Sequence, residues 1–365
     1  MAYLGENKFF SFRDGFCEAA SEASVTSKEA AELGRTLTRF FSRFCVGCDG
    51  FGQLHILYAL CSGISECGKD VYVCENTDMP SFRFGSPLLS ADCGIFISGG
   101  GSLKLSFFDS RGFAILEKSL IDILRAEPPM PSDRTGRINV STTFRSIYVN
   151  NIRDNFRLNH KLPAGVSCGS RSVRSLWNEF FTGEDDELVF QVSDDGQRVN
   201  AYSTAVGFVS AENLSLVYCM KKSSQGETVF LPDTFHYAAG NDNICRFSPE
   251  SGVPDSEGCS RFLKDPLFMC VDLASDKEGF IRILREMPRF ASAKREIVFT
   301  SPELFDIPRR ISSENGRVII TRSGRSRLSL LAQSLSSETA AELCSHWCEK
   351  LRKLDDCRPF SMDID

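Results

Sequence analysis

The chain has 365 residues, of which 42% are hydrophobic and 25% are charged. A chain of this length is too long for a single hydrophobic core, so we expect a folded protein of two to four domains. The formal net charge of −6 is spread along the sequence, which argues against nucleic acid or an anionic membrane as the main partner. Any anionic ligand must therefore be met by local arginines.

The N-terminal stretch MAYLGENKFFSFRDG lacks a basic run followed by an apolar one, and no segment is apolar for long enough to span a bilayer. We therefore expect a cytoplasmic protein with no membrane partner. The cysteines number fifteen, which is odd. Without an export signal, we expect them to be reduced thiols that pack as small hydrophobic side chains.

Two cysteine pairs have spacings that could serve metal or redox chemistry. Cys45 and Cys48 lie in a predicted buried strand, where residues three apart point to opposite faces, so packing is favoured over chelation. Cys344 and Cys348 lie on a predicted helix and share a face, whereas His346 between them does not. Core packing is again favoured, and a surface metal pair is the alternative.

The first 125 residues alternate between helical and strand patterns. Thr26 or Ser27 is a good N-cap, Glu29 falls in the first helical turn, and Gly68 is placed to end the second helix. Hydrophobic spacing predicts helices at 26–44 and 53–67, strands at 45–49, 70–75 and 91–98, and a hairpin at 104–116. This order is typical of an α/β layer with parallel strands.

The rest of the chain predicts three further units after a proline-rich linker at 126–137. The predicted elements are helices at 142–158, 210–222, 276–287 and 337–354, and strands at 187–193, 226–233, 268–273, 316–323 and 328–335. We expect an α/β multidomain protein with successive α/β/α layers and a C-terminal α+β domain. The predicted domains are 1–130, 131–222, 223–299 and 300–365.

Five sequence runs in the first unit follow one another in a recognisable order. They are VGCD (46–49), ALCSGISECGKDVYV (59–73), TDMP (77–80), GIFISGGGS (94–102) and KLSFFDSRG (104–112). This series resembles the α-D-phosphohexomutases, which include phosphomannomutase, phosphoglucomutase and phosphoglucosamine mutase. The resemblance implies a phosphohexomutase-like fold of four domains. It also implies an isomerase of carbohydrate metabolism that moves a phosphate between two sugar hydroxyls through a phosphoserine and one metal ion.

The loop at 98–103 departs from the family pattern T-A-S-H-N-P. The family's phosphoserine falls on Gly100, which has no oxygen to carry a phosphoryl group. If catalysis survives, the candidate nucleophiles are Ser102 and Ser98, and Lys104 follows as a nearby cation. The glycines at 99–101 have two interpretations: a backbone anion cradle or a bare remnant of the active loop.

The turn SDDGQR, residues 193–198, matches the family's metal loop D-G-D-G-D-R. Only Asp195 stands at a family ligand position, while Asp194 replaces a glycine and Arg198 keeps the final arginine. Mg²⁺ requires oxygen ligands in tight geometry, and one carboxylate with two neutral side chains would hold it poorly. Two hypotheses stay open: a turn without metal, or a Mg²⁺ site built from Asp194, Asp195 and Ser193.

A phosphate-binding turn is suggested near the end of the chain. The family's R-P-S-G-T-E-P aligns with Arg322, Ser323, Gly324 and Arg325. A guanidinium offers paired donors to phosphate, a serine adds one more, and a glycine lets backbone amides approach. The alternative is an ordinary basic hairpin.

Two weaker motif matches complete the resemblance. The family's sugar-recognition run G-E-x-S-G-H corresponds to a stretch that contains Glu250 and Ser251. In the N-terminal run F-G-T-D-G-I-R-G the family arginine is replaced by Cys17, and Arg13 could reach the same place.

The sequence thus supports three hypotheses of function. The first is a pseudoenzyme that binds hexose phosphates with impaired or absent phosphoryl transfer and no cofactor, and with no nucleic-acid or membrane partner. The second is a divergent active mutase that uses Mg²⁺ and a relocated phosphoserine. The third is a structural or regulatory subunit, since 30 phenylalanines could include an interface, although most should be core. No protein partner is indicated.

Overall fold

The structure is a computed structural model, and its chain divides into two compact units. One unit comprises Met1–Leu231 and Asn241–Arg285, and the other comprises Pro232–Gly240 and Glu286–Asp365. The residues that the structure describes are 10–13, 16–19, 25–99, 103–115, 117–124, 126–183, 187–232, 243–247, 253–254, 260–287, 291–298, 310–313, 316–322 and 327–356.

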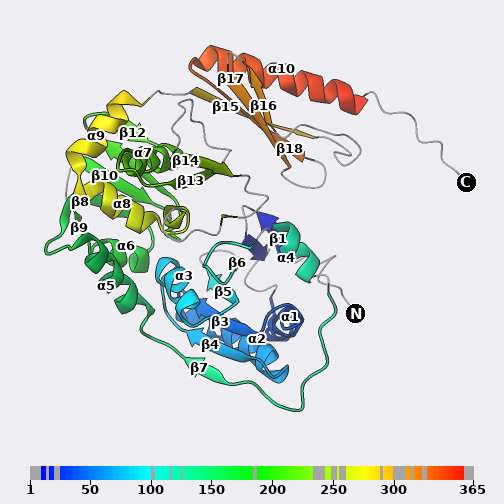
Figure 1. The fold of residues 1–365 in the computed structure, drawn as a ribbon. Coiled ribbons are helices and arrows are strands. Elements are labelled where there is room, and N and C mark those ends of the chain that lie inside the picture. Colours follow the sequence, from blue (N-terminus) through cyan, green and yellow to red (C-terminus); the bar gives the residue numbers. More distant parts are fainter. Residues whose placement is uncertain are drawn as a thin grey trace, which may run out of the picture. The chain divides into compact units, whose positions relative to one another are not determined.

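The first unit contains a seven-stranded sheet in the order β1-β2-β6-β5-β3-β4-β7 (Figure 1). Its strands are β1 (Phe10–Arg13), β2 (Phe16–Ala19), β3 (Arg43–Cys48), β4 (Asp70–Cys74), β5 (Cys93–Ser98), β6 (Lys104–Phe108) and β7 (Ile138–Val140). Strand β3 pairs in parallel with β4 and β5, whereas β6 is antiparallel to β5. The predicted parallel layer is therefore confirmed. Strand β7 extends it past residue 130, the predicted end of the first domain.

Helices cover both faces of this sheet. Helices α1 (Ser27–Leu37), α2 (Leu54–Glu66) and α4 (Glu117–Leu124) share a core with one face, and Figure 1 shows α1 and α2 side by side. On the other face lie α3 (Met79–Leu88) and the start of α5 (Phe144–Phe156). The N-cap of α1 is Thr26, which forms a reciprocal capping box with Glu29. This part of the unit is thus an α/β/α sandwich, as the sequence predicts.

A second, five-stranded sheet lies in the same unit, in the order β12-β11-β10-β8-β9. Its strands are β8 (Leu162–Cys168), β9 (Phe181–Gly183), β10 (Leu188–Val192), β11 (Val199–Ser203) and β12 (Gly207–Val209). Helices α6 (Arg171–Trp177), α7 (Ala211–Ser224) and α8 (Pro266–Ser275) contact it. The buried Trp177 packs on Phe181 and Phe190. The unit is completed by β13 (Val229–Pro232), β14 (Ile244–Phe247) and α9 (Lys277–Glu286).

The second unit is an antiparallel sheet backed by one long helix. The strands are β15 (Ala291–Val298), β16 (Arg310–Ser313), β17 (Gly316–Arg322) and β18 (Arg327–Ser334), in the order β15-β18-β17-β16, and the helix is α10 (Ser337–Asp356). The thiols of Cys344 and Cys348 enter its hydrophobic core, while His346 is exposed. This arrangement confirms the α+β ending and the packing interpretation of these cysteines.

The cysteines of the first sheet also pack as predicted. Cys48 belongs to the core under α1 and α2, whereas Cys45 belongs to the core under α3, so the two thiols lie on opposite faces. Burial raises the pKa of both thiols. Within the described ranges, no three His, Cys, Asp or Glu side chains are grouped to hold a metal ion. No described helix is both long and apolar enough to cross a membrane.

Two predicted elements are wrong. Residues 268–273, predicted as a strand, lie within α8, where Asp265 caps the helix by accepting a hydrogen bond from the Phe268 amide. Almost every side chain of α8 is buried, so its apolar run lacks helical periodicity. The first helix ends at Leu37 instead of residue 44, because Phe44 pairs with Cys93 in the sheet.

Candidate functional site

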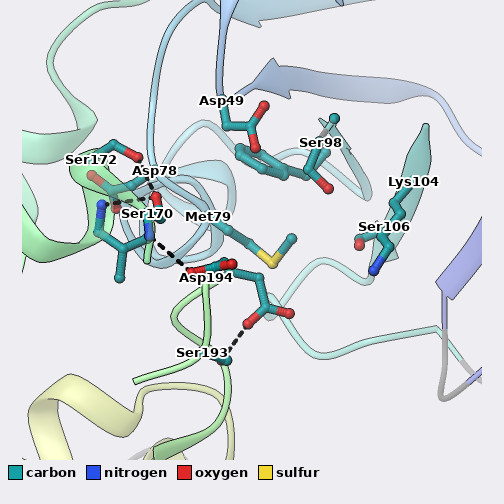
Figure 2. A pocket seen from close by; sticks show the side chains of 14 residues that line it. Asp49, Asp78, Met79, Ser98, Lys104, Ser106, Ser170, Ser172, Ser193 and Asp194 are labelled. Carbon is teal, nitrogen blue, oxygen red and sulfur yellow. Dashed lines mark hydrogen bonds between the residues drawn. The ribbon is translucent and has the colours of Figure 1, made fainter. Parts of the chain in front are cut away.

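A cavity of about 490 Å³ lies in the first unit, where β3 and β5 end (Figure 2). Both sheets of the unit contribute to its wall. The polar lining consists of five serines, four aspartates and one lysine: Ser98, Ser106, Ser170, Ser172, Ser193, Asp49, Asp78, Asp194, Asp195 and Lys104. The ends of parallel strands are the usual place for a ligand in α/β folds, because loops with free polar groups meet there.

The wall from the first sheet holds two carboxylates by burial. Asp49 follows β3, and desolvation raises its pKa although a backbone hydrogen bond from Gly99 opposes the shift. Asp78 is the N-cap of α3 and accepts a hydrogen bond of 2.8 Å from the Ser81 amide. Burial raises the pKa of Asp78 despite that hydrogen bond and the nearby Arg145. These two groups are fixed in place by the fold of the first sheet.

The same wall contains two of the residues that the sequence singled out. Ser98 ends β5 and Lys104 begins β6, and the two are directly paired in the antiparallel register. Both line the cavity, together with Ser106 (Figure 2). The other candidate nucleophile, Ser102, and the glycine at position 100 lie outside the described residues.

The opposite wall is formed by the turn at 193–198, whose polar groups bind one another. The Ser193 hydroxyl donates to Asp195 Oδ1 at 2.5 Å and accepts from the Arg198 amide at 2.9 Å. The same Oδ1 accepts from the Gln197 amide at 3.0 Å, and the Gly196 amide donates to the Ser193 carbonyl at 2.8 Å. The turn is closed by its own side chains and needs no ion to hold its shape.

Two glycines fix this turn against its surroundings. A Cβ atom at Gly169 would overlap the Asp194 carboxylate, which accepts a hydrogen bond of 2.9 Å from the Ser170 amide. Gly196 has a φ of 72°, and a Cβ atom there would lie 2.8 Å from Cγ of Pro80 in α3. The turn therefore rests directly on the helix that carries Asp78.

The comparison with solved structures shows the fold of the chain. The sequence matches no family model and no curated protein. Two solved structures superpose on nearly the whole chain. A phosphoglucomutase/phosphomannomutase family protein from Burkholderia thailandensis has a TM-score of 0.70 at 14% identity and covers 98% of this chain and 99% of its own. The chain has the phosphohexomutase fold. A protein assigned as a phosphomannomutase from Thermus thermophilus has a TM-score of 0.62 at 13% identity, with coverages of 94% and 99%.

Within this phosphohexomutase fold, the described residues do not fit a magnesium ion. Asp195 uses one carboxylate oxygen to accept two hydrogen bonds inside the turn, and the hydroxyl of Ser193 is occupied on both sides. Asp194 accepts from the Ser170 amide across the cavity edge. A hard cation needs several oxygens aimed at one point. The turn therefore supports no chemical step through Mg²⁺.

The cavity also contains residues that the sequence did not single out as a site. Asp49, Asp78, Ser106, Ser170 and Ser172 all line it. A signal for three of them is available. Asp49 follows a buried strand, Asp78 precedes Pro80 as a helix N-cap, and Ser170 is the N-cap of α6. Ser106 and Ser172 carry no such signal.

The side chains of the remaining predicted site residues lie outside what the structure describes. The backbones of Arg13 and Arg322 belong to β1 and β17. Their side chains lie outside what the structure describes, as do Ser323, Gly324, Arg325, Glu250 and Ser251 in full.

Proposed function

We propose that this protein binds hexose phosphates with a phosphohexomutase fold and does not transfer the phosphoryl group. The observation that carries the proposal is the turn at 193–198. Ser193 and Asp195, which stand at family metal-ligand positions, are hydrogen-bonded to each other and to the backbone of the turn. Phosphoryl transfer in this chemistry depends on a cation that neutralises the developing charge. The replacement of the family serine by Gly100 points the same way.

Sugar binding is supported by the chemistry of the cavity. Serine hydroxyls and carboxylates are the groups that accept and donate hydrogen bonds to sugar hydroxyls. The cavity of about 490 Å³ is within the range of small-molecule sites. Among the described residues that line it, Lys104 is the one cation. Separately, the resemblance of residues 322–325 to the family's phosphate-binding turn supports phosphate recognition by the second unit. The described cysteines are free thiols, which supports a cytoplasmic location.

The test of binding is a calorimetric titration with glucose 1-phosphate, glucose 6-phosphate and mannose 6-phosphate. We expect saturable binding of at least one of them, weakened in Arg322→Ala. Arg39→Ala removes an arginine from the other unit and serves as the matched control. No binding by any of the three sugar phosphates would contradict the proposal.

An active mutase is the second candidate, and one observation favours it. Ser98 lines the cavity and is paired in register with Lys104, an arrangement that could support a nucleophile. Intact mass after incubation with glucose 1,6-bisphosphate and Mg²⁺ separates the two functions. A phosphate adduct that disappears in Ser98→Ala or Ser102→Ala, but not in Ser106→Ala, would support an active mutase. The same result would contradict the proposal that the protein does not transfer the phosphoryl group.

A further inference from the structure

The five-stranded sheet of the first unit buries one face and exposes the other. In β10 the side chain of Phe190 is buried and that of Gln191 is exposed, and in β11 Ala201 is buried and Tyr202 is exposed. Strands β8, β9 and β10 are parallel, and parallel strands are usually covered on both faces. Only residues 184–187 connect β9 to β10, whereas a crossover that carries a helix needs a dozen residues or more. One face of this sheet is therefore open to a ligand.

A row of apolar side chains crosses the open face. Tyr202 on β11 lies directly opposite Phe208 on β12 and, on its other side, Val189 on β10. Phe208 is 62% exposed and Tyr202 is 46% exposed, while Val189 is half-buried. Because neighbouring strands are ~4.8 Å apart, the two rings form one continuous aromatic surface. Adjacent exposed aromatic side chains of this kind mark binding surfaces, whereas single exposed ones do not.

A second row, parallel to the first, is polar and uncharged. Gln191 on β10 lies opposite Asn200 on β11 and Ser167 on β8. This row is two residues further along the strands, a distance of ~6.8 Å. Oδ1 of Asn200 accepts a hydrogen bond of 3.0 Å from the Ala211 amide, which holds the side chain in place. Neither row contains a charged side chain, although 25% of the chain is charged.

We infer that the open face of the five-stranded sheet binds an uncharged, extended glycan chain. Aromatic rings pack against the C–H faces of pyranose rings, and amide and hydroxyl groups bind sugar hydroxyls. The strand spacing of ~4.8 Å is close to the length of one pyranose unit, so Phe208 and Tyr202 contact successive sugars while the polar row lies alongside. A face without charge is complementary to a neutral ligand.

The glycan site is separate from the cavity and goes beyond the proposed function. The residues of the two rows are Ser167, Val189, Gln191, Asn200, Tyr202 and Phe208, and the cavity is lined by other residues. A second copy of the chain is the competing occupant, since interface cores are also aromatic and poor in charge. The polar row argues against it, because amide and hydroxyl groups that are buried without partners cost free energy. A glycan supplies hydroxyl partners along its whole length.

The first experiment uses the full, unaltered chain. Calorimetry measures the affinity for cellohexaose, a neutral and extended chain of glucose units, and for cellobiose. We expect saturable binding of cellohexaose and at least about fivefold weaker binding of cellobiose, which is too short to contact both rings and the polar row. We also expect the affinity for cellohexaose to stay the same between about 50 and about 500 mM NaCl, because no charge takes part.

The second experiment changes the aromatic row. Phe208→Ala and Tyr202→Ala should each weaken binding of cellohexaose at least about fivefold. Phe208→Tyr keeps an aromatic ring and should retain affinity, whereas Phe208→Leu keeps apolar area without a ring and should not. The matched control is Phe40→Ala, which removes a 50% exposed phenylalanine outside this sheet and should leave binding unchanged. Far-UV circular dichroism checks that each variant is folded.

The possible results separate this inference from its competitor and from the proposed function. No binding of cellohexaose, or equal binding by the unaltered chain and Phe208→Ala, would overturn the inference. Sedimentation velocity tests the other occupant: a dimer that becomes a monomer in Phe208→Ala would assign the face to a second copy and overturn the glycan site. Hexose phosphate titrations should be the same for the unaltered chain and Phe208→Ala. Failure of those titrations would overturn the proposed function and leave the glycan site standing.

Discussion

The two walls of the cavity hold their carboxylates in opposite ways. In the wall of the first sheet, Asp78 has a side chain only 1% exposed and Asp49 is half-buried, and burial raises the pKa of both. In the opposite wall, Asp194 and Asp195 are exposed and held by hydrogen bonds from their own turn and its neighbour. The first wall depends on core packing, and the second depends on local hydrogen bonds. Substitutions in the two walls should therefore lower the free energy of unfolding by different amounts.

The largest effect is expected where helix packing supports the first wall. A Cβ atom at Gly85 of α3 would overlap the ring of Phe144. Gly85→Ala should therefore lower the free energy of unfolding by about 3 kcal/mol, since overpacked cores must shift backbone or leave good rotamers. Urea unfolding monitored by fluorescence measures it. Gly52→Ala, where nothing lies within 4 Å of the added carbon, is the control, and equal losses in both variants would refute the packing argument.

A smaller effect is expected where the two walls meet. Gly196→Ala combines a φ of 72° with a new contact at 2.8 Å from Pro80. We expect a loss of about 2 kcal/mol, of which about half is backbone strain. Gly207→Ala has a φ of 78° and open space around it, so it isolates the strain. Thermal unfolding measures the stability loss of both variants, and the difference between the two losses is the cost of the contact with Pro80. No difference between them would show that the turn does not rest on α3.

The second wall alone should respond still less. Ser193→Ala removes the hydroxyl that joins Asp195 to the Arg198 amide. We expect a loss of about 1 kcal/mol, because this partly exposed turn can recruit water in place of the hydroxyl. Thermal unfolding in the presence and absence of Mg²⁺ checks it, with Ser106→Ala from the other wall as the comparison. Stabilisation of the unaltered chain by Mg²⁺ that is lost in Ser193→Ala would mean that the turn does bind the ion.

The smallest effect concerns pH and the first wall. Burial raises the pKa of Asp78 in the folded state. A carboxyl with a raised folded pKa contributes stability below its unfolded pKa of about 3.9, and that contribution is lost as pH rises through the folded value. Asp78→Asn cannot ionise, so its stability relative to the unaltered chain should increase between about pH 4 and about pH 7. Urea unfolding of both proteins at about pH 4 and at about pH 7 measures this relative stability. A relative stability that decreases with pH would contradict the prediction.

The predictable part of this protein is the part that local pattern determines. Thr26 with Glu29, and Gly68 after α2, are visible in the sequence because caps depend on neighbouring residues. The same holds for the alternation that separates Cys45 from Cys48. The sequence does not predict element ends that tertiary contacts determine. Phe44, for example, pairs with Cys93 in the sheet instead of extending α1.

The site divides along the same line. Ser98, Lys104 and the turn at 193–198 were found because a family motif places them, and the structure brings them to one cavity. Ser170 and Ser172 were missed because their role depends on α6 beginning beside Asp194. No pattern within either segment indicates that contact. The hydrogen bonds that close the turn on itself are not predictable from the sequence, since SDDGQR is compatible with a metal loop and with a plain turn.

The buried thiols behind the first wall provide a way to observe these differences directly. Cys45, Cys48 and Cys61 are fully covered, and burial raises the pKa of Cys61 to about 12. Only the thiolate reacts with an alkylating reagent, so these side chains stay unlabelled until the sandwich opens. The rate at which mass spectrometry finds them alkylated reports how often that opening occurs. A variant of the first wall should accelerate the labelling of these cysteines more than a variant of the turn does.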